Sequence, residues 1–444
     1  MADPYEKETG AVALAHGQRG EGQTSPLRQR PFVLYVAGQL LSQLGDGIYL
    51  VALPFVVLSH GGPARLGVVL TCYGVARLAV LPLGGTLADR RGARRVMLAT
   101  DAARAGVVLG YVPIGLLHAV PLWALLAVSV PFGLLDGVFR PASLAVLPDI
   151  VPPASLAAAN SLNSTLQSTG QIAGPAVGGV LVGGLKSGTG MLADAITFAV
   201  SSVTLFAIGI RRGASQAISV AETPWTRRAE EAAAVPRPSA GADVAEGPPG
   251  WRPVLAYAWH SPVLRMSLIV TFVVNLTLGG LVDVVLPPFS VAPLGAGARG
   301  FGIMVAGIGL GSVAGSLAGA PLMRLKRRGV LAVWLGMAEG ALVICVPTGN
   351  SLAIATAALF LVAVIQGMLN VLYVTTLQRD APAGALGRVM SLLIACAFVA
   401  YPVSTGVFGA LIGVAGPTEL IRVAGLCLIA AFSIGFTSRA YREI

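Results

Sequence analysis

The feature that most constrains the fold is a short, strongly charged turn between two long apolar runs. It reads GGTLADRRGARR at residues 84–95 and holds one acid and four arginines. About twenty apolar residues precede this turn and about twenty follow it, so each flank is long enough to cross a hydrocarbon core of roughly 30 Å as a helix. The turn must therefore lie at a membrane surface, and its arginines favour the cytoplasmic side.

The composition excludes an ordinary soluble protein. Of the 444 residues, 55% are hydrophobic and only 11% are charged, and the mean hydropathy is +0.78. A soluble globular core does not accommodate these values, which indicate a polytopic membrane protein in a lipid bilayer. The net charge of +10 comes mostly from arginines in short connectors rather than on one basic face, so we expect no nucleic-acid partner.

Apolar runs and their breaks predict an all-α protein of twelve membrane-spanning helices, six on each side of a polar stretch at 211–262. The predicted spans are 31–58, 66–88, 96–117, 120–144, 159–185, 189–210, 263–290, 300–323, 330–347, 351–377, 388–413 and 417–438. The domains are then two bundles at 31–210 and 263–438. The polar stretch is a cytoplasmic linker, and residues 1–30 and 439–444 are cytoplasmic tails.

Charges in the predicted connectors give the orientation. With both termini inside, most Lys and Arg residues fall on the inner side, as the positive-inside rule requires. The outer connectors hold only Arg65, Lys186, Arg299 and Arg422. The excess of Arg, Ala and Gly over Lys is typical of a GC-rich bacterial genome, so we expect a protein of the bacterial cytoplasmic membrane. We also expect it to be a monomer.

The two halves repeat one another, which indicates two pseudo-symmetric bundles. The matched pairs include Gly67 with Gly302, Gly74 with Gly309, Pro175 with Pro402, and Gly179 with Gly406.

Ionisable residues inside the spans are candidates for a proton relay or a substrate site, because a charge in hydrocarbon is costly. Asp46 lies about fifteen residues into the first span, and Arg77 lies at similar depth, roughly 20 Å above the inner end of the second. We expect them to form an ion pair that opens when Asp46 is protonated or when a cationic substrate competes for it. A permanent structural pair is the alternative.

Two more acids are candidates in other spans. Asp136 and Arg140 are four residues apart and share a helix face, so a local pair is favoured over a cavity site. Asp283 has no basic residue within one turn. A lone intramembrane acid of this kind suits a proton carrier, with a packing role as the alternative.

Enzymatic and ATP-driven activities are disfavoured. None of the lysines, which are Lys7, Lys186 and Lys326, follows a glycine as a phosphate-binding loop requires. Neither HExxH nor GxSxG occurs. We therefore expect no enzyme, no bound cofactor and no metal, but a secondary transporter.

Three motifs carry a family resemblance. The charged turn contains Gly85-x-Leu87-Ala88-Asp89-Arg90-x-Gly92, and the fifth span contains Gly170-x-x-x-Gly174-Pro175-x-x-Gly178-Gly179. Residues 141–160, 194–198 and 387–390 form a third set. Together they resemble the major facilitator superfamily, specifically its macrolide-efflux and enterobactin-exporter-like branch of drug:proton antiporters. The resemblance covers nearly all of the chain outside the first thirty residues and the linker.

The resemblance implies a cytoplasmic gate at the charged turn. Asp89 would bond the N-terminus of the eleventh span near Arg388 and hold that side shut. The implied gating residues are Gly85, Asp89, Arg90, Gly92, Arg94 and Arg388. The family usually has a basic residue directly after the second glycine, where this chain has Ala93, so the partner bond is expected to be rewired. A plain topogenic charge cluster is the alternative.

The resemblance also assigns roles to other spans. The fifth-span motif, with Gly170, Gly174, Pro175, Gly178 and Gly179, would pack closely and seal the pathway, although small-residue faces occur in many membrane bundles. The seventh span would line the cavity, which makes Asp283 a site candidate. Asp194 and Glu339 would serve packing or hydrogen bonding.

The function implied is proton-coupled export of small hydrophobic compounds, cationic ones among them, by alternating access. A dedicated exporter of one siderophore or of a self-made antibiotic is the alternative. A transport-dead sensor would need a long ordered cytoplasmic domain, and the fifth-span motif disfavours an uptake symporter.

Overall fold

The computed structural model describes residues 29–111, 120–152, 155–184, 187–208, 259, 261–322, 328–380 and 386–437, and these ranges contain helices and short connections but no strand. The predicted tails and the linker lie almost entirely outside the described residues. The exact bundle boundaries therefore stay predictions.

The N-terminal half begins with a 62-residue helix that contains two spans. This helix, α2, breaks at Gly62, whose φ of 75° and ψ of 178° leave helical geometry and suit a residue without a side chain. Its first arm (30–61) and second arm (63–91) run in opposite directions. The elements of this half are α2 (Arg30–Arg91), α3 (Ala93–Leu109), α5 (Leu122–Ala145), α6 (Leu147–Ile150), α7 (Leu156–Gly184) and α8 (Ser187–Ala207).

The C-terminal half follows the same plan and ends in another double helix. This helix, α16, breaks at Gly416, where φ is 74°, into arms at 386–415 and 417–433. The elements are α11 (Pro262–Gly280), η5 (Leu281–Val285), α12 (Leu286–Val291), α13 (Gly297–Leu322), α14 (Arg328–Cys345), η6 (Thr348–Asn350), α15 (Leu352–Asp380), α16 (Leu386–Ser433) and η7 (Ile434–Thr437). The first three form one rod, in which η5 is a π-helical turn.

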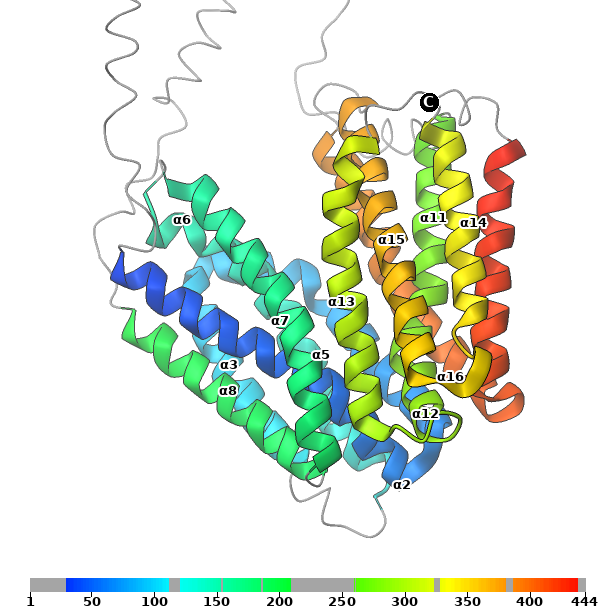
Figure 1. The fold of residues 1–444 in the computed structure, drawn as a ribbon. Coiled ribbons are helices and arrows are strands. Elements are labelled where there is room, and N and C mark those ends of the chain that lie inside the picture. The colour runs from blue at the N-terminus through cyan, green and yellow to red at the C-terminus, as the bar shows by residue number, and fades with distance from the viewer. Residues whose placement is uncertain are drawn as a thin grey trace, which may run out of the picture.

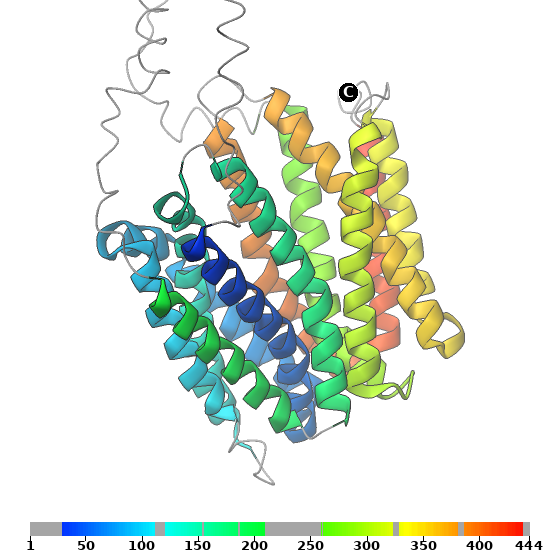
Figure 2. The same ribbon diagram turned by 60° about the vertical axis from the view of Figure 1, so that its left-hand side comes forward.

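The described helices account for the predicted crossings. Eight of them are long and apolar enough to span a membrane, and α2 and α16 each contribute two spans. Helices α3 and α7 run beside them in the same bundle (Figures 1 and 2). The prediction of an all-α fold with two six-helix bundles is confirmed.

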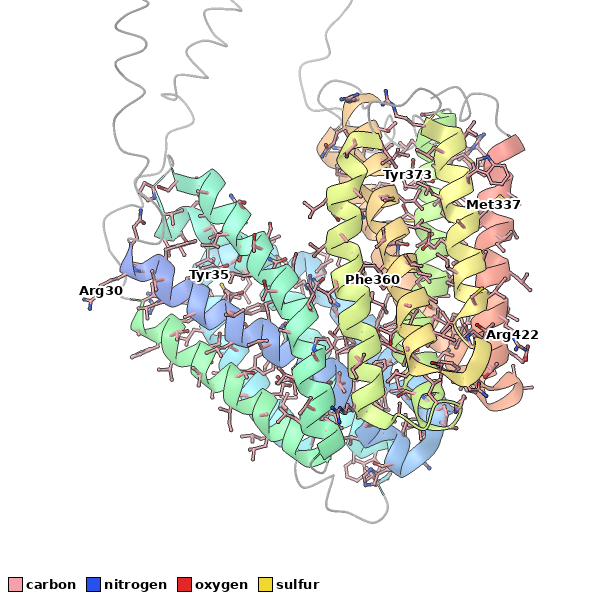
Figure 3. The ribbon with its side chains drawn as sticks, viewed as in Figure 1. Arg30, Tyr35, Met337, Phe360, Tyr373 and Arg422 are labelled. Carbon is pink, nitrogen blue, oxygen red and sulfur yellow. The ribbon has the colours of Figure 1, made fainter. Side chains whose placement is uncertain are left out.

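The two halves are tilted relative to each other. In Figure 1 the helices α2, α5, α7 and α8 slant, whereas α11 and α13–α16 stand upright, and the two sets approach at one end and separate at the other. Figure 3 places Arg30 at the end where they separate and Arg422 at the end where they approach. We call these the diverging end and the converging end.

The first of two interfaces between the halves lies between the second arm of α2 and the first arm of α16. A Cβ added to Gly67 would lie 2.3 Å from the Cα of Gly409, and one added to Gly74 would lie 3.0 Å from the ring of Tyr401. Only glycine permits this approach of the two backbones.

A matching interface lies between α13 and α7. A Cβ on Gly302 would lie 2.8 Å from the Cα of Gly179, and one on Gly309 would lie 2.8 Å from the side chain of Ile172. Gly302 and Gly309 are the repeat partners of the two α2 glycines. The internal repeat therefore places equivalent glycines at two equivalent contacts between the halves.

Candidate functional site

A buried charge cluster in the N-terminal half centres on Asp136 of α5. Arg77 Nε lies 2.8 Å from one carboxylate oxygen of Asp136, and the Tyr73 hydroxyl donates to the same oxygen at 3.1 Å. The Arg104 guanidinium donates to the other oxygen at 2.6 Å. Asp136 thus joins both arginines through its two oxygens, and its charge is compensated from two neighbouring helices.

Arg104 of α3 is fully enclosed, with none of its side chain exposed. It also lies 3.6 Å from Asp101, one turn earlier on the same helix, and Asp101 accepts a 2.7 Å hydrogen bond from Ser201 of α8. Its guanidinium lies over the rings of Phe139, Phe132 and Phe198, at 4.3, 5.6 and 5.5 Å from their centres. Two acids and three aromatic faces surround one cation, so Arg104 ties three helices together.

The sequence reasoning missed Asp101 and Arg104. Both fall inside the predicted third span and are three residues apart, which is the spacing of an intrahelical pair. That signal was sufficient to place them among the intramembrane charges.

The predicted Asp46–Arg77 pair is wrong for this conformation, because Arg77 pairs with Asp136. Counting residues along a span gives depth but not the direction in which a side chain points. Asp46 is half-buried and forms no ion pair or hydrogen bond with the described residues. It lies close enough to Arg104, Asp136 and Arg77 to interact with their charges.

The predicted Asp136–Arg140 pair is also wrong. Both carboxylate oxygens of Asp136 are taken by arginines of other helices, and Arg140 is exposed. Arg140 acts on Asp136 and Asp46 only through space.

The C-terminal half brings its own acid to the junction. Asp283 lies in the π-helical turn η5 and accepts a 2.7 Å hydrogen bond from the Tyr401 hydroxyl of α16. From the same helix, the ring of Phe398 lies 5.3 Å from the Arg77 guanidinium. Arg77 therefore contacts an acid of its own half and an aromatic ring of the other, and it also interacts through space with Asp283.

We call Arg77, Asp136, Asp283, Phe398 and Tyr401 the interface site. The first three were predicted as site residues, and the two aromatic residues were not. Phe398 and Tyr401 lie in the eleventh span, which the sequence predicts as an apolar helix. Their pairing with α2 and η5 is a tertiary contact for which the chain carries no local signal.

The gate residues of the charged turn form no hydrogen bond or ion pair with the described part of α16 in this conformation. Asp89, Arg90 and Gly92 are exposed, and a Cβ added to Gly85 or Gly92 would meet nothing within 4 Å. Asp89 forms no ion pair or hydrogen bond with the described residues. Because Gly92 ends α2 with a φ of 85°, this turn requires glycine whatever its role in gating.

On the opposite half, Arg388 has one guanidinium nitrogen buried without a hydrogen-bond partner among the described residues. The implied contact between Asp89 and the start of α16 is thus open here. It stays a prediction for a conformation in which the diverging end closes.

Arg94 has a different partner from the one implied. It donates to the carbonyl oxygens of Leu205 and Phe206 at the end of α8, at 2.7 Å each. Partial burial, followed by the neighbouring charge of Arg95, lowers the pKa of Arg94, although an arginine stays protonated at neutral pH. Arg94 is therefore assigned to the C-terminus of α8, which it caps within its own half, and not to the gate.

The fifth-span motif lies at two helix contacts. A Cβ on Gly170, Gly174 or Gly178 would lie 2.4, 2.7 or 2.9 Å from Gln43, Gly47 or Ile48 of α2, respectively. Its last glycine, Gly179, lies against α13 as described above, where the carbonyl of Pro175 approaches Gly302. The motif thus packs α7 against both its own half and the other, and whether it seals the pathway stays a prediction.

Helix α7 carries a polar face toward the diverging end. Its exposed residues there are Asn160, Ser161, Ser164, Thr165 and Thr169. Thr169, Thr165 and Ser161 continue, at helical spacing, the face by which α7 contacts α13 at Ile172. Across the separation, α13 exposes Ser312 and Ser316. The hydroxyls of Thr165, Thr169 and Ser316 donate to backbone carbonyl oxygens one turn earlier in their own helices, so these polar faces are satisfied within each helix.

Two further acids lie away from the junction. Asp194 in α8 and Glu339 in α14 are both fully buried. Neither oxygen of Glu339 has a hydrogen-bond partner among the described residues. The same holds for both carboxylate oxygens of Asp194, so of the packing or hydrogen bonding expected for these two acids only the packing is seen among the described residues.

These features define a class: a polytopic helical membrane protein with two pseudo-symmetric bundles and compensated charges at their junction, the architecture of a secondary transporter. The chain belongs to the Major Facilitator Superfamily, whose family profile matches residues 35–405. The family prediction is confirmed. The chain is therefore a membrane transporter rather than an enzyme.

Two of the curated relatives are drug-efflux proteins. Multidrug efflux pump Tap of Mycolicibacterium fortuitum is 26% identical over 400 residues, which are 88% of this chain and 91% of that protein. Macrolide efflux protein A of Streptococcus pyogenes is 26% identical over 208 residues, 46% of this chain and 51% of that protein. The prediction of a drug-efflux branch is consistent with both.

Solved structures agree on the fold alone. The nucleoside transporter NupG superposes with a TM-score of 0.68 at 12% identity, covering 92% of this chain and 100% of that one. A peptide transporter, POT, gives 0.67 at 14% identity, with 92% and 94% covered.

Proposed function

We propose that the chain is an efflux pump that exchanges small hydrophobic compounds, cationic ones among them, for protons by alternating access. The observation that carries this proposal is the interface site, where Arg77 pairs with Asp136 and lies over Phe398 of the other half. Tyr401, one turn from Phe398 on the same helix, donates to Asp283. The efflux proteins among the curated relatives support the direction of transport.

The state of the carboxylates supports an exchange of proton for cation. Both oxygens of Asp136 are occupied by arginines, so its role is to hold Arg77. Asp46 has no partner among the described residues, and Asp283 has only the Tyr401 hydroxyl on one oxygen. Asp46 and Asp283 are therefore the proposed groups that carry either a proton or the positive charge of a substrate.

The aromatic residues support a hydrophobic substrate. Phe398, Tyr401 and Tyr73 surround the charges of the interface site. Aromatic faces beside a carboxylate suit a lipophilic cation, because the rings attract positive charge and cover apolar surface. Substrate selection is proposed to depend on these rings.

The orientation proposed places the diverging end in the cytoplasm. Arg90, Arg91 and Arg95 are exposed where α2 and α3 meet, as expected for a cytoplasmic connector. The described conformation is then inward-facing, and the contact of Asp89 with the start of α16 forms when this end closes. We propose a monomer in the bacterial cytoplasmic membrane, with protons as the only coupling partner and no bound cofactor.

The test is transport by the purified full chain in proteoliposomes. Ethidium, tetraphenylphosphonium and a macrolide would be followed under an imposed pH gradient, with and without a protonophore. We expect movement of at least the cations that stops when the gradient collapses, and its loss in Asp283→Asn. No movement of any compound, or movement indifferent to the protonophore, would contradict the proposal.

A further inference from the structure

The rod that carries Asp283 is disturbed by a side chain from another helix. The Gly280 N–H of α11 donates to the Ser404 hydroxyl of α16 at 2.6 Å, and that hydroxyl donates in turn to the Leu276 carbonyl. In a regular α-helix the N–H of residue 280 bonds the carbonyl of residue 276. The Ser404 hydroxyl thus bonds both the N–H and the carbonyl that would pair with each other in a regular α-helix. A side chain inserted between such groups is a recognised cause of helix distortion.

The distortion begins directly after this contact. Residues Leu281–Val285 form the π-helical turn η5, with Asp283 at its centre. A π turn adds one residue to a helical turn, which rotates the following side chains by about 100° relative to an unbroken helix. The direction of Asp283 toward Tyr401 therefore depends on the π turn.

The approach of Ser404 is built into both helices. Ser404 is fully buried. A Cβ added to Gly280 would lie 2.7 Å from the Ser404 hydroxyl oxygen and 2.6 Å from the ring of Phe408, so glycine is required opposite this serine. Ser404 and Tyr401 are three residues apart on one face of α16. One hydroxyl holds the helix just before the π turn, and the other holds the acid inside it.

The next residue of α16 continues toward the N-terminal half. Thr405 lies 3.0 Å, hydroxyl to hydroxyl, from Thr71 of α2, and Thr71 lies less than two turns before Arg77 on that helix. The segment 401–405 therefore contacts η5 on one side and the helix of Arg77 on the other. A change in this segment reaches both charged partners of the interface site.

We propose that Ser404 is a positioning residue: its hydroxyl, inserted in the hydrogen-bond ladder of α11, maintains the π turn that directs Asp283 toward Tyr401 and the substrate. This inference depends on the proposed function, because it assigns Ser404 a role in binding cationic substrate at Asp283. Ser404 itself does not touch the substrate.

The test is a double-mutant cycle on equilibrium binding of tetraphenylphosphonium to the purified full chain. Ser404→Ala is expected to weaken binding roughly three- to ten-fold, the effect of one hydrogen-bonding hydroxyl. In an Asp283→Asn background the same change is expected to have no further effect, because Ser404 acts through the charge of Asp283. Ser404→Thr retains the hydroxyl and is expected to retain wild-type affinity.

The results of this cycle separate failure of the Ser404 positioning role from failure of the proposed function. Equal weakening in both backgrounds, or wild-type binding by Ser404→Ala, would overturn the positioning role while leaving cation binding intact. Absence of binding by the wild type would overturn both proposals. If Ser404→Ala is not monodisperse, Ser404→Cys provides the same comparison, since a thiol fills the volume but forms weaker hydrogen bonds.

Discussion

At the scale of single residues, the charge of Arg104 shows how the N-terminal half tolerates ions inside a membrane. Its guanidinium has carboxylates of two helices and three aromatic rings around it. Breaking such a set leaves its partners charged and unpaired in a medium that cannot solvate them. We assign Arg104 to stability and Arg77, which is partly exposed at the junction, to function.

The first prediction concerns this division. Arg104→Leu leaves Asp101 without its cation and removes one of the two arginines that hold Asp136. The change is expected to cost about 3–5 kcal/mol of folding stability, seen as a large fall in the melting temperature in detergent. Arg140→Gln is the matched control, because Arg140 is exposed and forms no ion pair among the described residues. Equal melting temperatures for the two variants would refute the structural role of Arg104.

At the scale of elements, the charged turn and the glycine contacts are the features that would have to change between conformations. The turn at 84–95 forms no hydrogen bond or ion pair with the described part of α16, whereas Gly67 and Gly302 are in close contact with the other half. If the protein alternates between two conformations, the contact between the charged turn and α16 must form, and the glycine contacts between the halves must loosen.

The second prediction addresses the turn. Asp89→Asn is expected to abolish transport while leaving expression intact, because an amide cannot supply the negative charge that the N-terminus of α16 favours. Arg91→Gln, an exposed neighbour, is expected to retain transport. Wild-type flux in Asp89→Asn would leave the turn with only a topogenic role.

The third prediction addresses the glycine contacts. Gly302→Ala places a Cβ 2.5 Å from the Pro175 carbonyl and is expected to push α13 from α7, which lowers both thermal stability and transport. Gly106→Ala is the control, since nothing lies within 4 Å of a Cβ there. A Gly302→Ala variant as active and stable as this control would show that the close approach is dispensable.

The elements also show how far sequence reasoning reaches. Hydropathy predicts the spans because lipid leaves a backbone little choice but to satisfy its hydrogen bonds within a helix. The internal repeat predicts which glycines are equivalent, and the structure places them at equivalent contacts. The pairs Asp46–Arg77 and Asp136–Arg140 were wrong because they were inferred from depth and from spacing on one helix. The partners actually chosen, Arg77 and Arg104 for Asp136, depend on how the helices α2, α3 and α5 pack.

At the scale of the whole molecule, the two bundles share the interface site, to which each contributes residues. Close contacts between them lie at the glycine interfaces, and polar faces of α7 and α13 lie where the bundles separate. This arrangement suits rocking of one bundle against the other around a fixed site, as in alternating access.

The fourth prediction tests this motion. Spin labels are placed at Ser164 and Ser316, which are both exposed. The distance between them, measured by double electron–electron resonance, is expected to shorten when substrate or pH shifts the population toward the conformation with the diverging end closed. Labels at Ala64 and Thr348 are expected to move apart under the same conditions. A single unchanged distance distribution for both pairs would contradict rocking.

The central claim is that a proton and a cationic substrate compete for the same carboxylates inside the bundles. Protonation neutralises Asp46 or Asp283, so lowering the pH should weaken cation binding, and binding should release protons. The most direct measurement is the proton release when tetraphenylphosphonium is added to purified protein in weakly buffered solution. Our account predicts release by the wild type and its loss in the double variant Asp46→Asn with Asp283→Asn; binding by the wild type without any proton release would contradict it.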